Sequence, residues 1–185
     1  VLDSSTSNGM SNQNLLSNIL LLESSKERSR KLSRALSSPL ESNPRRRMDV
    51  DSIIMSVSLR VARSLKPELE YNFGENLSVY LLPNWEDQSF YLDKELDLER
   101  VSVIDLPWMF NSNISYLRNL PKKRNRYFAF GYDSYDIALL LNNPSSTRQF
   151  KYTGMSGELS YKNGSLSRKS LKTEISGGLF KVIGY

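Results

Sequence analysis

Ile53-Ile54-Met55-Ser56-Val57 is a short apolar run, and it directly follows the charged stretch Pro44-Arg45-Arg46-Arg47-Met48-Asp49-Val50-Asp51. A helical pattern through Ala62 and Leu65 comes next, and a second apolar run occupies residues 77–82. A strand, a helix and another strand in this order predict a right-handed βαβ unit in a parallel sheet. The fold class is therefore α/β. The residues that we expect in one buried, largely parallel sheet are Ile53, Ile54, Val79, Leu81, Val101 and Val103.

The second half of the chain carries further local signals. Residues 101–104 read as a third strand that ends before Pro107, and a helix is expected from about Tyr132 to Leu141. Asn163-Gly164 is a strong two-residue hairpin signal because both turn positions need positive φ. Gly177-Gly178 predicts another turn near the end of the chain.

The amino-acid composition limits the kinds of catalytic and metal sites that the chain can form. The chain has 185 residues, of which 39% are apolar and 24% charged, so it can form a domain with a sizeable core. It contains neither cysteine nor histidine, which excludes disulfides, thiol nucleophiles, Cys/His zinc sites and histidine acid–base catalysis. No apolar run approaches the ~20 residues that span a bilayer. The chain begins at Val1 without a signal peptide or a lipobox cysteine, so we interpret it as a fragment that lacks its natural N-terminus.

Three segments carry a family resemblance: Pro44 to Asp51, Ser64-Leu65-Lys66-Pro67, and Asp105-Leu106-Pro107-Trp108. Together they resemble the C-terminal domain of the LppC/LpoA lipoproteins, periplasmic outer-membrane proteins that activate a class A penicillin-binding protein. The resemblance extends from about Leu20 to the C-terminus. One departure is that the family usually has an aromatic residue a few positions after the arginine that Arg168 matches, where this chain has Lys172.

The resemblance implies a type I periplasmic binding-protein-like fold, present here as a partial domain. It would consist of a Rossmann-like lobe with a parallel sheet and a C-terminal β-hairpin. We expect residues 14–106 to form one lobe, 107–147 to cross to the other lobe, and 148–185 to return as the hairpin. Residues 1–13, rich in Ser and Asn, are expected to be a mobile end.

Four residues are candidates for a ligand cleft. Asp105 and Trp108 lie at the C-terminal end of a strand, the edge outside which open α/β sheets bind ligands. Tyr132 and Asp133 follow on a helix, where the ring could stack on a ligand and Asp133 with Asp136 could do acid–base work or hold a cation. Three of them also have a structural interpretation: Trp108 as a half-buried tryptophan, Tyr132 as a packed aromatic, and Asp133 as a carboxylate in the first turn favoured by the helix dipole.

Arg45, Arg46 and Arg47 are the candidate partner-binding residues, since three adjacent arginines suit carboxylates, phosphates or an acidic protein face. The alternative is a solvated loop whose arginines pair with Asp49 and Asp51. The other basic stretch, residues 122–126, has no aromatics interleaved with it, so we expect no nucleic-acid partner. The formal net charge of +5 suits an anionic partner without selecting one.

The function implied by the resemblance is non-enzymatic regulation of peptidoglycan synthesis. The chain would dock on a class A penicillin-binding protein at the periplasmic side of the outer membrane, with a lipid anchor outside this chain and peptidoglycan as a further candidate partner. The alternative is a periplasmic solute-binding module with an interlobe cleft for a small ligand. We expect no catalytic residues, no metal and no cofactor, since the sequence contains no recognisable catalytic constellation.

Overall fold

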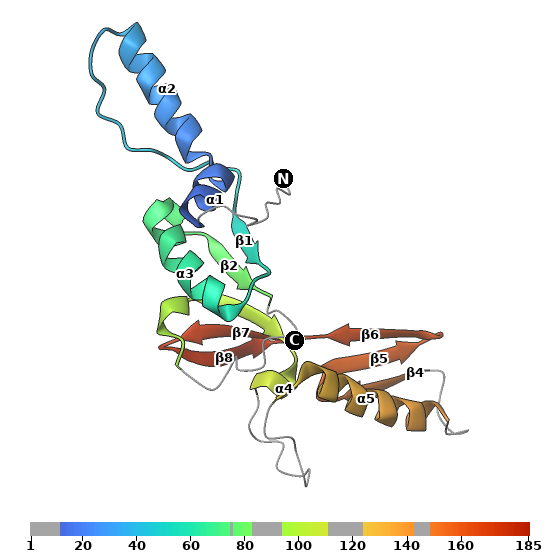
Figure 1. The fold of residues 1–185 in the computed structure, drawn as a ribbon. Coiled ribbons are helices and arrows are strands. Elements are labelled where there is room, and N and C mark those ends of the chain that lie inside the picture. The colour runs from blue at the N-terminus through green and yellow to red at the C-terminus, as the bar shows by residue number, and fades with distance from the viewer. Residues whose placement is uncertain (1–11, 75, 83–93, 111–123, 143–148) are drawn as a thin grey trace. The chain divides into compact units, whose positions relative to one another are not determined.

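The computed structural model describes residues 12–74, 76–82, 94–110, 124–142 and 149–185 (Figure 1). The chain divides into two compact units, residues 1–53 with 60–79 and residues 54–59 with 80–185. Most of the predicted mobile end, residues 1–11, lies outside the described residues. The proposed lobe boundaries remain predictions.

The first unit is built mainly from helices. These are α1 (Asn12–Ile19), α2 (Leu22–Ala35), most of α3 (Leu59–Leu69) and a π-helical turn, η1 (Glu70–Gly74). Leu20 and Leu69 are almost completely buried and form part of its core. Within the described parts of the chain, no helix is both long enough and apolar enough to cross a membrane.

The larger sheet confirms the α/β fold class. It has five strands in the order β1-β2-β3-β7-β8 and includes parallel pairing. β7 runs antiparallel to both β3 and β8. The strands are β1 (Ser52–Met55), β2 (Ser78–Leu81), β3 (Val101–Asp105), β7 (Leu171–Ser176) and β8 (Leu179–Gly184), and a 3-10 turn, η2 (Leu96–Leu98), precedes β3.

Burial in this sheet matches four of the six predicted residues, while Ile53 is only partly buried and Ile54 departs most. Val79, Leu81, Val101 and Val103 are all buried, as expected. Ile54, however, is 63% exposed, so its predicted burial is wrong. β1 is an edge strand, and alternate residues of a strand point to opposite faces, so an apolar run at an edge need not be covered on both.

The second sheet has three strands in the order β4-β5-β6. They are β4 (Gln149–Thr153), β5 (Glu158–Lys162) and β6 (Ser165–Lys169), and the helices that precede them are α4 (Pro107–Phe110) and α5 (Arg126–Leu141). The predicted hairpin at Asn163-Gly164 is confirmed: it joins β5 to β6, with Tyr161 opposite Leu166. Asn163 and Gly164 have φ of 50° and 81°, as a type I′ turn requires. The turn at Gly177-Gly178 is confirmed as well, between β7 and β8.

The helix expected from Tyr132 begins six residues earlier, at Arg126. Asn125 caps it, because its side-chain oxygen accepts a hydrogen bond of 2.8 Å from the Tyr127 amide. The apolar stretch before Tyr132 therefore forms the first turns of α5. This shift changes the surroundings of every acidic residue on the helix.

Gly164→Val should destabilise the protein by about 1–2 kcal/mol, because a β-branched residue would be forced into the left-handed region. A Cβ at this position would meet no atom within 4 Å, so the cost is conformational and not steric. Urea unfolding measures it, and Ser165→Val in the adjoining strand is the matched control. Equal stability of the Gly164 variant and the wild type would contradict the turn assignment.

Candidate functional site

Asp105 and Arg126 form a buried ion pair that joins two elements of the second unit. Asp105 is the last residue of β3, and Arg126 is the first residue of α5. The Arg126 Nε lies 3.1 and 3.0 Å from the two carboxylate oxygens, and Nη2 lies 2.6 Å from Oδ2. The arginine side chain is 2% exposed and the aspartate side chain 6%. Charges that are buried this deeply need a partner. The Asp105 carboxylate, a candidate for the ligand cleft, therefore joins α5 to β3 through Arg126.

Trp108 lies in α4, inside a hydrophobic cluster and 3% exposed. Its ring is 5.6 Å from the ring of Phe128, and the Arg124 guanidinium lies 5.9 Å from its centroid. Its backbone amide donates to the Met155 carbonyl at 3.0 Å. The indole Nε1 has no hydrogen-bond partner among the described residues. Trp108 is therefore more deeply buried than the half-buried tryptophan of the structural interpretation.

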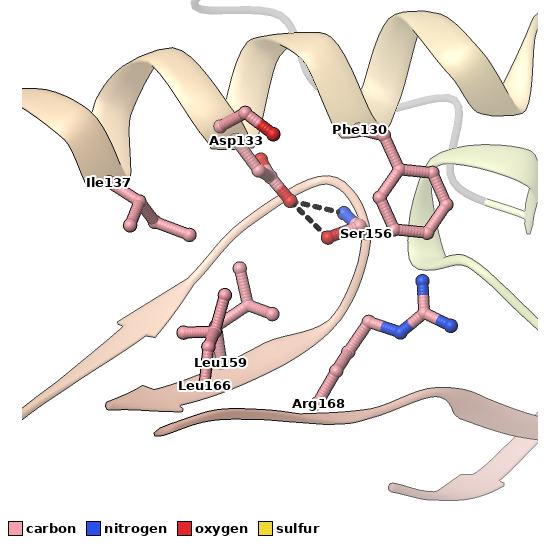
Figure 2. Close-up of a pocket in the computed structure, with 8 residues that line it drawn as sticks. Phe130, Asp133, Ile137, Ser156, Leu159, Leu166 and Arg168 are labelled. Carbon is pink, nitrogen blue, oxygen red and sulfur yellow. Dashed lines mark hydrogen bonds between the residues drawn. The ribbon is translucent and has the colours of Figure 1, made fainter. Parts of the chain in front are cut away.

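Asp133 lies in the middle of α5, so its expected place in the first turn is wrong. The residue is 2% exposed, and its carboxylate reaches the loop between β4 and β5. Its Oδ1 accepts a 2.9 Å hydrogen bond from the Met155 amide, and Oδ2 accepts from both the amide and the hydroxyl of Ser156 (Figure 2). A Cβ at Gly154 would overlap this carboxylate, so the loop approaches it closely because residue 154 is glycine.

The acidic residues of α5 do not act as a pair. Asp136 accepts a 2.6 Å hydrogen bond from the Tyr152 hydroxyl on β4. Burial and this hydrogen bond raise the pKa of Tyr152 well above its usual range. Tyr132, the remaining cleft candidate, lies with its ring 6.3 Å from that of Phe128. Among the residues that the structure describes, no group of three acidic side chains could hold a metal ion.

A small pocket opens between α5 and the hairpin of β5 and β6 (Figure 2). Its volume is about 140 Å³. The guanidinium of Arg168 lies 4.6 Å from the centroid of the Phe130 ring. Of the four cleft candidates only Asp133 lines this pocket. The other lining residues are Phe130, Ser134, Ile137, Ser156, Leu159, Leu166 and Arg168.

This pocket was not predicted from the sequence. The one signal for it was Arg168, which matched an arginine of the family. The apolar lining residues come from a helix and two strands, and nothing in their spacing reveals that they meet.

The three arginines of the charged loop have different surroundings. Arg47 donates from Nε and Nη2 to the two carboxylate oxygens of Asp49, at 2.7 and 2.6 Å. Arg46 donates from Nη1 to the carbonyls of Arg47 and Val50, each at 3.1 Å. Arg45 is exposed, and its backbone amide donates to the Ser25 hydroxyl at 3.0 Å. Two of the three guanidinium groups therefore hold the loop itself, and Arg45 is the arginine that faces solvent.

The family assignment rests on most of the chain. The sequence profile described as "LppC putative lipoprotein" matches residues 9–171. The chain belongs to this family. The similar curated relative "Penicillin-binding protein activator LpoA" of Aliivibrio fischeri is 23% identical over 173 residues, which cover 89% of this chain and 29% of the relative.

Solved structures show the same fold at low sequence identity. Full-length LpoA from Haemophilus influenzae superposes with a TM-score of 0.58 at 18% identity, over 71% of this chain and 26% of that one. The LpoA C-domain of the same organism, "a regulator of PBP1A", gives 0.53 at 16% identity, over 84% and 49%. A "putative branched-chain amino acid ABC transporter" from Rhodospirillum rubrum gives 0.52 at 16%, over 72% and 44%. The chain thus spans less than a third of the full-length relatives.

Arg126→Met should destabilise the protein by about 3–5 kcal/mol, because the Asp105 carboxylate would stay buried without its partner. The double variant Arg126→Met with Asp105→Leu should recover most of this loss, since neither charge remains. Chemical unfolding of the two variants and the wild type gives both values. Equal stabilities of the single and double variants would show that the pair does not join β3 to α5.

The Asp49 carboxyl should titrate well below its usual range. The hydrogen bond from Arg47 lowers its pKa from 3.8 to about 2. Since the folded-state pKa is depressed, the pair stabilises the loop above the ordinary pKa, and this contribution disappears as the pH falls toward 2. An NMR titration should find a midpoint near 2 in the wild type and near the ordinary value in Arg47→Gln. Identical midpoints would contradict the pairing.

Proposed function

We propose that this chain forms part of a non-enzymatic activator of peptidoglycan synthesis that docks on a class A penicillin-binding protein. The family match over residues 9–171 is the observation that carries the proposal. The relative from A. fischeri is a penicillin-binding protein activator, and the H. influenzae C-domain is a regulator of PBP1A. In this function the docked protein shifts the synthase toward its active conformations, through contacts that differ between conformations.

A non-enzymatic role is supported by the contacts of three acidic side chains, which all bind other parts of the chain. Asp105 is paired with Arg126, Asp133 holds residues 155 and 156, and Asp136 holds Tyr152. A general acid or base needs a carboxyl group that a substrate can reach. These three carboxylates instead serve to position the elements of the second unit, and we propose that the chain recognises its partner through its surface.

Membership of the family also supports a proposal about where in the cell the protein acts. We propose that the protein acts at the periplasmic side of the outer membrane, attached by a lipid anchor outside the described residues. From there it would reach the periplasmic part of a synthase.

Solute binding is the second candidate function. The R. rubrum transporter protein shares only the fold with this chain, and that shared fold is the reason to test solute binding. A panel of free amino acids and short peptides, tested by calorimetry, separates the two functions. A solute bound with micromolar affinity, together with no binding to the synthase, would favour transport.

Arg45→Glu should slow association with the class A penicillin-binding protein of the same organism by about 3- to 10-fold at low salt, if the exposed arginine faces an acidic partner surface. The change leaves the bonds of Arg46 and Arg47 intact, so it tests partner contact and not loop structure. Biolayer interferometry over a salt series measures the rate, and a glycan-polymerisation assay measures activation. Arg45→Lys, which keeps the charge, is the control. If Arg45→Glu associates with the synthase at the wild-type rate, the exposed arginine does not contact the partner.

A further inference from the structure

The pocket between α5 and β5–β6 has an apolar interior and a polar rim. Ile137 and Leu159 are buried at its walls, and Phe130 is half-buried. Ser134, Leu166 and Arg168 lie on the solvent side, and all three are exposed. These exposed residues place the opening of the pocket between α5 and β6, an edge strand of the three-stranded sheet.

The charge at this rim is positive. Asp133, the acidic lining residue, is buried and accepts three hydrogen bonds from within the chain. Arg168 stacks on Phe130, and in the parts of the chain that the structure describes no carboxylate pairs with it. Stacking on an aromatic ring leaves the N–H edge of a guanidinium available to a carboxylate. An occupant of the pocket would thus meet an apolar interior beside a ready cation.

The volume limits what the occupant can be. At about 140 Å³ the pocket is close in size to a ~150 Å³ protein cavity that accommodates benzene. Sites for complete small-molecule ligands usually measure about 300–1,000 Å³. The pocket fits one aromatic ring or branched apolar side chain, and it is too small for a free solute of ordinary size.

We infer that this pocket anchors one apolar side chain of the partner synthase, and that a neighbouring Asp or Glu of the same segment pairs with Arg168. The inference rests on the proposed function and names the contact through which docking would occur. Side chains that fill a desolvated pocket at the centre of an interface dominate its affinity. The cationic rim at Arg168 makes an acidic partner segment the complementary one, and the net charge of +5 has the same sign.

Two substitutions test the apolar and the charged half of the contact separately. Ser134→Trp places a large ring over the opening from an exposed helix position, and Arg168→Glu reverses the rim charge. Each should weaken binding to the purified class A penicillin-binding protein at least about tenfold. Lys151→Glu is the matched control. It makes the same charge change on the same sheet, at an exposed position that faces away from α5, and should stay within about twofold of the wild type. Thermal unfolding midpoints of all variants verify the fold.

A photo-crosslinking residue provides a readout that does not depend on either substitution. Benzophenylalanine in place of Leu166 should crosslink to the synthase, and the same residue in place of Lys151 should not. Mass spectrometry of the product should locate an apolar residue next to an Asp or Glu. A crosslinked segment without a carboxylate would overturn the inference.

The remaining outcomes distinguish a failure of this inference from a failure of the proposed function. If Ser134→Trp and Arg168→Glu both bind the synthase with wild-type affinity and still activate it, the pocket contact is overturned. The proposed function then stands. No binding by the wild type would overturn both. Phenylacetate serves as the small-molecule probe: saturable micromolar binding that Ser134→Trp abolishes would make this a solute site and overturn the inference.

Discussion

The buried ion pair between Asp105 and Arg126 fixes the geometry on which the rest of the second unit depends. It joins the end of β3 to the start of α5, with both side chains almost completely removed from solvent. Once α5 is held there, its acidic residues reach the three-stranded sheet. Asp133 binds the loop at residues 155 and 156, and Asp136 binds Tyr152 on β4. These buried or partly buried charged residues connect elements of the second unit.

The same arrangement has a functional consequence. Asp105, Asp133 and Asp136 are all engaged in contacts within the chain, while apolar residues and Arg168 line the pocket beside α5. The pocket beside α5 exists because Phe130, Ile137 and the β5–β6 hairpin converge there. A surface of this kind suits recognition of another protein. The named relatives are an activator of a penicillin-binding protein and a regulator of PBP1A.

The sequence predicted much of the fold and little of the pocket. Local apolar runs located β2 and β3, and Asn163-Gly164 located its hairpin, because these signals reside in adjacent residues. Burial of Ile54 was predicted wrongly, since whether a strand lies at the edge of a sheet depends on the other strands. The start of α5 was also misplaced. Its first turns are aromatic and apolar, and the capping signal was the single residue Asn125.

The sequence by itself determined the α/β class, the hairpin turns, the absence of thiol and imidazole chemistry, and the family resemblance. Only the tertiary structure decided what the candidate residues do. Asp105 meets a partner 21 positions away, and Asp133 meets backbone amides 22 and 23 positions away. Contacts across such distances depend on how helices and strands assemble, and no local pattern encodes them. For this reason the sequence could name Asp105 and Asp133 as important, but it could not show that both hold the fold together.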